Sequence, residues 1–186
     1  MTDNVQNAIG MLEFNSIVKG METCDIMLKA ANVRPLRCCS VCPGKYIALV
    51  AGDVGSVNAA MDAGEKACGE YIVDALRIPK AHNQLIPALS GAAEVIRGEA
   101  VGGLEFFSIS GAILAADEAV KAAAVSLIDV RIGYAVGGKG VVLFTGETGA
   151  VERALKAAKT RASDAGTLIC ATLIHRPSEE LYQSLL

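Results

Sequence analysis

The amino-acid sequence predicts an α/β protein in which one β-α-β-β-α-β unit occurs twice. The first observation is an internal repeat: residues 8–14 recur in related form at 100–106, and residues 25–33 recur at 117–125, each 92 positions later. The second is a change of hydrophobic period within each copy, from short apolar runs typical of strands to segments with apolar residues at helical spacing. The third is length, because 186 residues accommodate two units of roughly 90 residues each.

The elements of the first copy follow from these patterns in chain order. Strands are expected at 8–14, 33–41, 46–51 and 71–78, and helices at 20–31 and from 52 to about 69. Cys42-Pro43-Gly44 separates the two middle strands, because proline fixes φ and glycine permits the backbone conformation of a tight turn. The second copy repeats this order with two extra residues in the equivalent loop, and residues 82–96 are expected to form a short helix and linker. The predicted domains are therefore 1–96, which includes the linker, and 97–186.

The composition favours a protein that assembles with other chains. Hydrophobic residues make up 52% of the chain and charged residues 20%, and the mean hydropathy of +0.41 is high for a soluble domain. Charged residues or glycines interrupt every apolar run before the roughly 18 residues that a membrane span needs. We expect the excess apolar surface to lie in subunit contacts.

Charge and cysteine content exclude some classes of partner. The net charge is −3, and the chain has no basic run and no tryptophan, so no nucleic-acid partner is expected. Residues 1–4 show neither a basic region nor an apolar core, so the protein is expected to stay inside the cell. The six cysteines are then expected to be free thiols or metal ligands rather than disulfides.

The two copies differ most in one loop. The first copy has Cys38-Cys39-Ser40-Val41-Cys42-Pro43-Gly44-Lys45, whereas the second has Ile132-Gly133-Tyr134-Ala135-Val136-Gly137-Gly138-Lys139. When the two copies are aligned on the shared Gly-Lys pair, Val136 occupies the position equivalent to Cys42. A duplicated scaffold with one chemically distinct loop suggests that the scaffold assembles and that the loop carries the chemistry.

These residues resemble the bacterial microcompartment shell proteins, in particular the class with two shell domains in tandem that forms trimers. The resemblance covers residues 8–177 and rests on three motifs together: Gly-x-x-Glu from Gly10, Asp-x-x-x-Lys-x-Ala-x-Val from Asp25, and Gly-Asp-Val-Gly from Gly52. It implies two unpermuted shell domains, each with an antiparallel sheet, and a homotrimer that forms a pseudo-hexameric tile. It further implies a place in a microcompartment shell within the cytoplasm, with other shell proteins and enclosed redox enzymes as partners.

The resemblance also implies roles for particular residues. Cys-Pro-Gly-Lys in the first copy alone is similar to the propanediol-utilisation type of this class, whose trimer holds an iron–sulfur cluster in its pore. It assigns Cys42 as the metal ligand of one [4Fe–4S] cluster per trimer, on the threefold axis, and a pore lining of Pro43, Gly44, Val136, Gly137 and Gly138. It places Lys29, Lys121 and Arg176 at the subunit edge. The family usually has Arg-Pro after the last strand of a domain, as in Arg176-Pro177, whereas the first copy has Lys80-Ala81 at this position.

The chemistry of the cysteine loop leaves alternatives open. Three thiolates can hold three irons of a cluster that normally has four cysteine ligands, which leaves one iron open. Gly44, Gly137 and Gly138 would let backbone N–H groups approach the cluster sulfurs. Cys38 and Cys39 are lesser candidates as ligands. Successive strand residues point to opposite faces of a sheet, so the two cannot both face the pore axis. The alternative is that they are small hydrophobic packing residues. A cluster-free metabolite pore and a thiol–disulfide switch at Cys39 and Cys42 are the alternative functions.

The remaining polar and thiol residues are expected to be structural. Cys24, Cys68 and Cys170 lie in apolar contexts and are expected to pack in the core. Glu13 and Glu105 are equivalent strand residues with no base or nucleophile beside them in the sequence. We therefore expect no catalytic residues and no enzymatic activity.

Overall fold

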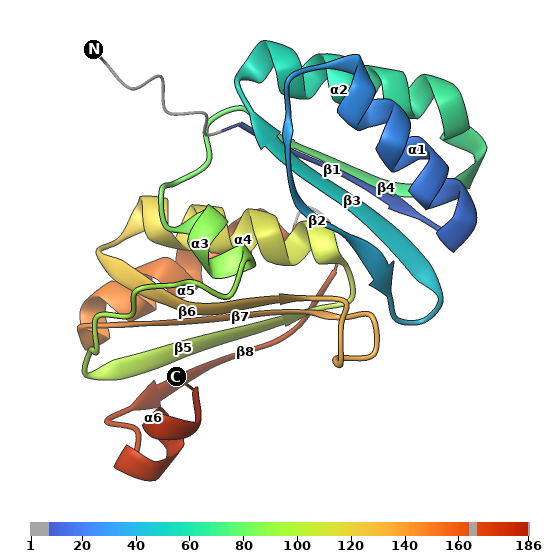
Figure 1. Cartoon of the computed structure of the whole chain (residues 1–186). Coiled ribbons are helices and arrows are strands. Elements are labelled where there is room, and N and C mark those ends of the chain that lie inside the picture. The colour runs from blue at the N-terminus through green and yellow to red at the C-terminus, as the bar shows by residue number, and fades with distance from the viewer. Residues whose placement is uncertain (1–7, 164–166, 186) are drawn as a thin grey trace, which may run out of the picture. The chain divides into compact units, whose positions relative to one another are not determined.

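A computed structural model describes residues 8–163 and 167–185 (Figure 1), and the chain divides into two units after Ala81. The first unit runs β1 (Ala8–Phe14), α1 (Ile17–Ala30), β2 (Arg34–Val41), β3 (Lys45–Gly52), α2 (Val54–Cys68), a 3₁₀ turn (Gly69–Tyr71) and β4 (Ile72–Ile78). Its strands form one antiparallel sheet in the order β2-β3-β1-β4. The two helices pack together on one face of this sheet (Figure 1).

The second unit repeats this arrangement and adds a helix at each end. It contains α3 (Leu85–Leu89), β5 (Ala100–Phe106), α4 (Ile109–Ala122), β6 (Val125–Ile132), β7 (Gly140–Gly146), α5 (Thr148–Ser163), β8 (Leu168–His175) and α6 (Glu179–Leu185). Its antiparallel sheet has the order β6-β7-β5-β8. The predicted fold class, two β-α-β-β-α-β units each with an antiparallel sheet, is confirmed.

Equivalent serines fix where the first helix of each unit begins. The Ser16 hydroxyl accepts a hydrogen bond from the Lys19 amide at 3.4 Å, and the Ser108 hydroxyl accepts one from the Gly111 amide at 3.0 Å. A serine in this role satisfies an amide that has no partner within the helix. The helix expected from residue 20 therefore begins at Ile17, one turn earlier.

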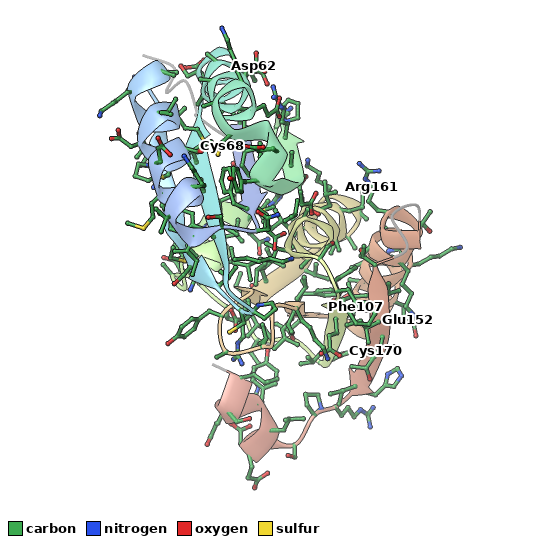
Figure 2. The ribbon with its side chains drawn as sticks, turned by 90° about the vertical axis from the view of Figure 1, so that its right-hand side faces the viewer. Asp62, Cys68, Phe107, Glu152, Arg161 and Cys170 are labelled. Carbon is green, nitrogen blue, oxygen red and sulfur yellow. The ribbon has the colours of Figure 1, made fainter. Side chains whose placement is uncertain are left out.

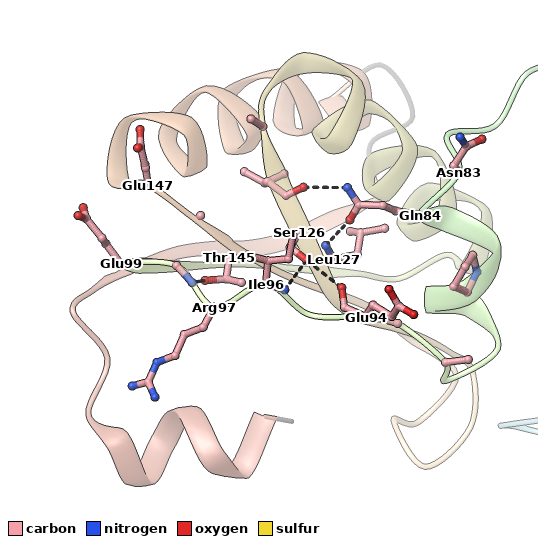
Figure 3. A pocket seen from close by; sticks show the side chains of 17 residues that line it. Asn83, Gln84, Glu94, Ile96, Arg97, Glu99, Ser126, Leu127, Thr145 and Glu147 are labelled. Atoms are coloured by element: carbon pink, nitrogen blue, oxygen red, sulfur yellow. Dashed lines mark hydrogen bonds between the residues drawn. The ribbon is translucent and has the colours of Figure 1, made fainter.

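Residues 82–98 pack on the second unit (Figure 3), whereas the sequence-based division placed 82–96 in the first domain. The side chain of Gln84 bonds the outer edge of β6: its amide nitrogen donates to the Val125 carbonyl at 3.0 Å, and its oxygen accepts from the Leu127 amide at 2.9 Å. Further along, the Ser126 hydroxyl accepts from the Ile96 amide at 3.1 Å. Chain connectivity alone did not indicate which sheet edge this segment would cover.

α6 closes the other face of the second sheet. Tyr182 is 1% exposed and packs with Val101 and Ile128. Its hydroxyl bonds Thr145 at 3.0 Å, and Arg97 lies over its ring, 4.5 Å from the centroid. Within the described residues, no helix is both long enough and apolar enough to cross a membrane.

Candidate functional site at the Cys42 turn

Cys42 lies at the tip of the hairpin that joins β2 and β3. The Gly44 amide donates to the Val41 carbonyl at 3.0 Å, which closes a four-residue turn with a cis peptide bond between Cys42 and Pro43. Gly44 has a φ of 81°, a conformation that side chains disfavour. Cys42, Pro43 and Gly44 are all exposed in the single chain. The turn thus presents a thiol to the surroundings, and the Gly44 amide is used to close the turn. The approach of backbone N–H groups to a cluster stays a prediction.

The three cysteines of this segment do not converge. Cys38 pairs with Ala48 and packs against the core beneath the helices, whereas Cys39 pairs with Ile47 and so points to the opposite face of the sheet. Within the described residues, no group of three histidine, cysteine or acidic side chains is placed to hold a metal ion. A single chain therefore offers one exposed thiol at the hairpin tip, not a complete metal site.

The equivalent loop of the second unit turns differently. The Lys139 amide donates to the Val136 carbonyl at 3.2 Å, and the Gly133 amide donates to the Lys139 carbonyl at 2.9 Å. Gly137 and Gly138 have φ values of 64° and 81°. Val136 and Gly138 are half-buried and Gly137 is exposed, so this loop presents backbone and an aliphatic side chain where the first presents a thiol.

A glutamate–lysine pair stands behind each loop. Lys45 bonds Glu13 at 2.9 Å in the first unit, and Lys139 bonds Glu105 at 2.9 Å in the second. The Lys139 ammonium, followed by the Cys170 thiol, lowers the pKa of the Glu105 carboxyl by hydrogen bonding. Each lysine lies more than 30 positions from its glutamate along the chain, so the pairs follow from the strand register and not from the local sequence.

The three predicted edge residues lie on the surface, and their role at a subunit edge stays a prediction. Lys29 is exposed at the end of α1 and bonds Asp25 at 2.5 Å. Lys121 makes the equivalent bond to Asp117, which is buried and also accepts a hydrogen bond from the His82 amide at 2.7 Å. Arg176 is exposed just after β8, with a φ of 46°.

The other cysteines divide between core and surface. Cys24 and Cys68 are buried, as expected, but Cys170 is exposed and the expectation that it packs in the core was wrong (Figure 2). Cys170 lies on the edge strand β8 opposite Glu105, and its thiol bonds that carboxylate at 3.5 Å. An apolar strand at a sheet edge can expose one of its faces, which the run of apolar letters does not reveal.

The fold and the repeated loops define a class of protein. The BMC domain model matches residues 8–81 and 100–177, one match for each unit, so the chain belongs to the BMC domain family. It is a shell component of a bacterial microcompartment, and proteins of this kind assemble with other shell proteins.

Two known proteins are similar to this chain over nearly its whole length. The chain is 39% identical over 181 residues to the bacterial microcompartment shell protein PduT of Citrobacter freundii, covering 97% of this chain and 98% of that one. This similarity agrees with the propanediol-utilisation shell protein T type that the loop resembles. A microcompartment protein from Desulfitobacterium hafniense DCB superimposes with a TM-score of 0.90 at 40% identity, over 95% of this chain and 98% of that chain.

Two further comparisons bear on the architecture. The fused permuted hexameric shell protein of the RMM microcompartment gives a TM-score of 0.63 at 26% identity, over 85% of this chain and 84% of that chain. The major carboxysome shell protein CsoS1 of Prochlorococcus marinus is 40% identical over 91 residues, which is 47% of this chain but 88% of CsoS1. CsoS1 thus corresponds in length to one unit, whereas this chain carries two.

Proposed function

We propose that three copies of this chain form a pseudo-hexameric shell tile whose central pore binds one [4Fe–4S] cluster through three Cys42 thiolates. The single observation that carries this proposal is the asymmetry of the loops: only the first unit presents a thiol at its hairpin tip. In a ring of six units from three chains, this asymmetry leaves three thiols rather than six.

The donor chemistry fits such a cluster. Thiolates are the usual protein ligands of iron–sulfur clusters, and Cys42 is exposed with no hydrogen-bond partner among the described contacts that would have to be broken. Among the described residues of one chain, no group of three side chains could hold a metal ion, so the proposal has each of three copies contribute one thiolate. Three thiolates would leave one iron without a cysteine ligand.

The cluster would supply one-electron chemistry for electron transfer across the shell. Alternatively, the pore would pass clusters to enclosed redox enzymes. The protein's own part is to hold the ligand. The turn bond from Gly44 to Val41 fixes the hairpin tip, and the Lys45–Glu13 pair anchors the start of β3 next to it. Val136 and its neighbouring glycines would form the intervening, non-ligating part of the pore wall.

The test compares two serine variants after anaerobic purification. Cys42→Ser removes the proposed ligand, and Cys170→Ser removes the other exposed thiol as a matched control. We expect the wild type and Cys170→Ser to contain iron and sulfide, with an EPR signal after reduction, and Cys42→Ser to contain neither. Iron content that is unchanged in Cys42→Ser would overturn the proposal.

Sedimentation of the same samples separates assembly from cluster binding. A trimer is expected for all three proteins, because the thiol is not needed for the fold. A colourless trimer after anaerobic reconstitution would favour the cluster-free metabolite pore instead. A reversible Cys39–Cys42 disulfide without iron would favour the thiol switch.

A further inference from the structure

The second unit has a groove at the end of its sheet where β6 begins (Figure 3). Parts of the linker, the start of β6 and the end of β7 line this groove, whose volume is about 980 Å³. Most of the lining is apolar and includes Ala93, Ile96, Val125 and Leu127. Such a lining favours an occupant with an apolar body.

The unneutralised charges of the groove are acidic. Glu94, Glu99 and Glu147 line it and are exposed, and their side chains have no ion-pair partner within the described part of the chain. The remaining charged residue is Arg97, which extends toward α6 and bonds Glu179 at 2.9 Å (Figure 3). Carboxylates beside apolar surface suit a cation on an aliphatic stem, such as an arginine side chain.

The equivalent end of the first sheet is basic. Arg34 and Arg37 on β2 occupy the positions of Ser126 and Asp129 on β6. They pair with alternate residues of β3, so both side chains point to the same face of the sheet. Arg34 is exposed and Arg37 is half-buried, and neither has an ion-pair partner among the residues that the structure describes. The first unit therefore presents two unpaired guanidinium groups where the second presents an acidic groove.

We propose that the groove binds Arg34 and Arg37 of a second copy of this chain, so that the first unit of one copy joins the second unit of another. Contacts between like units would instead bring arginine to arginine or glutamate to glutamate, which is unfavourable. The aliphatic stems would lie on the apolar lining, and the guanidinium groups would pair with Glu94 and Glu99. The contact uses side chains rather than strand pairing, so Pro35 on β2 does not oppose it.

The groove adjoins two of the residues predicted at the subunit edge. Ala124 in its lining follows Lys121 by three positions, and the Arg176 amide donates to the Glu99 carbonyl at 3.0 Å. The inference extends the proposed tile and rests on it: the two kinds of unit alternate around such a ring, so neighbouring tiles would join through unlike units. It does not depend on a cluster at Cys42.

The first experiment exchanges the charges and follows the association of purified tiles. One variant carries Arg34→Glu and Arg37→Glu, a second carries Glu94→Arg and Glu99→Arg, and a third carries all four changes. Sedimentation and electron microscopy at low salt measure the protein concentration at which assemblies larger than the trimer form. We expect this concentration to rise at least about tenfold in each two-residue variant, because like charges then meet.

The same charge exchange also tests whether the two surfaces meet each other. In the four-residue variant, and in an equal mixture of the two-residue variants, opposite charges face each other again, so assembly should return toward that of the wild type. Unchanged assembly in either two-residue variant, or no recovery in the four-residue variant, would overturn the proposal. A wild type that forms nothing larger than the trimer would also overturn it.

Circular dichroism and iron content of the same samples separate this contact from the proposed function. All variants should be folded trimers with the iron content of the wild type, since Cys42 is unchanged in each. A wild type that sediments as a monomer would overturn the tile itself. Iron-containing trimers that assemble equally well in every variant would overturn only the contact between tiles.

The second experiment identifies the occupant of the groove. Arg34→Lys and Arg37→Lys keep the positive charges and supply amines that a carbodiimide couples to a neighbouring carboxylate. Tiles of this variant are prepared separately with light and heavy nitrogen, mixed, coupled and digested. We expect linked peptides that join an introduced amine to Glu94, Glu99 or Glu147, with one light and one heavy member. Coupling of these glutamates only to other lysines, or only within one copy, would overturn the assignment.

Discussion

The two units share strand order and helix positions, but they fill the space between the first helix and the sheet in opposite ways. In the first unit, Gly20 on α1 leaves room for the ring of Tyr46, and a Cβ at Gly20 would lie 2.6 Å from the Tyr46 Cβ. In the second, the equivalent helix residue is Ala112 and the strand residue is Gly140, where an added Cβ would lie 2.4 Å from the Ala112 Cβ. Each unit thus keeps one glycine at this contact, but on opposite elements, because the helix and the strand approach too closely there for a side chain on both.

The edge strands differ as well. Gln84 bonds the outer edge of β6, whereas the equivalent stretch of β2 is largely exposed and contains Pro35, which has no amide to donate. A proline on an exposed edge strand discourages pairing with other chains. The second unit covers its edge strand with the linker, whereas the first unit has a proline on its edge strand that cannot donate a hydrogen bond to another strand.

The largest expected effect comes from exchanging the packing residues. Tyr46→Gly, which installs the residue of the second unit, should lower the free energy of unfolding by about 3–5 kcal/mol because it empties a filled core. Gly20→Ala alone should cost about 1–3 kcal/mol through overpacking. Urea unfolding of both single variants and the double variant measures the coupling.

In that cycle, Gly20→Ala should cost much less when Tyr46 is already glycine, because the clashing ring is gone. Strictly additive costs would show that the two positions do not compete for the same space. Residue volumes at equivalent positions would then be a poor guide to packing in this fold.

The sequence revealed the repeated fold because its evidence is local: periodicity, a proline–glycine turn and motifs that recur in both copies. It did not reveal contacts that depend on register, such as Glu13 with Lys45, which are adjacent only once β1 and β3 pair. The same limit hid the exposure of Cys170 on an edge strand. Strands, helices and turns within one segment were predictable, whereas neighbours across elements were not.

Removing the edge cover of β6 should have an intermediate effect. Gln84→Ala deletes two hydrogen bonds to the strand backbone and should cost about 1–2 kcal/mol. Hydrogen exchange at the Leu127 amide should become faster, while amides of β2 stay unchanged as the internal control. Gln84→Glu should also destabilise at neutral pH, since a carboxylate cannot donate to the Val125 carbonyl. An unchanged exchange rate at Leu127 would mean that the linker does not protect this edge.

A smaller effect is expected where the units differ in charge. Arg77 on β4 bonds Asp62 at 2.8 Å and Glu65 at 2.7 Å on α2, and hydrogen bonding to Glu65 raises the pKa of its guanidinium. Arg77→Leu should cost about 0.5–1 kcal/mol, less in high salt, because these pairs are partly exposed.

The second unit provides the matched reverse change. Its equivalent strand residue is Leu173, opposite Lys156 and Lys159 on α5. Leu173→Arg should destabilise at low salt and recover as salt is added, so the stability of both variants should approach that of the wild type in high salt. A cost that stays the same at high salt in either variant would contradict an electrostatic origin.

The smallest effect is expected at Glu105, which pairs with Lys139 beside the second loop. Its side chain is 31% exposed, whereas that of the equivalent Glu13 is 4% exposed. Hydrogen bonding from Lys139 lowers the pKa of Glu105, so its stabilising contribution is present above the pKa of an unfolded glutamate and is lost as the pH falls through the lower folded value. Glu105→Gln should therefore melt below the wild type at pH 7, and the gap should close below about pH 4. Thermal melts from pH 3 to pH 7 measure this, with the exposed Glu152→Gln as the control. A gap that persists unchanged at pH 3 would show that the Glu105 carboxylate acts through packing rather than charge, and the two loop anchors would then differ only in burial.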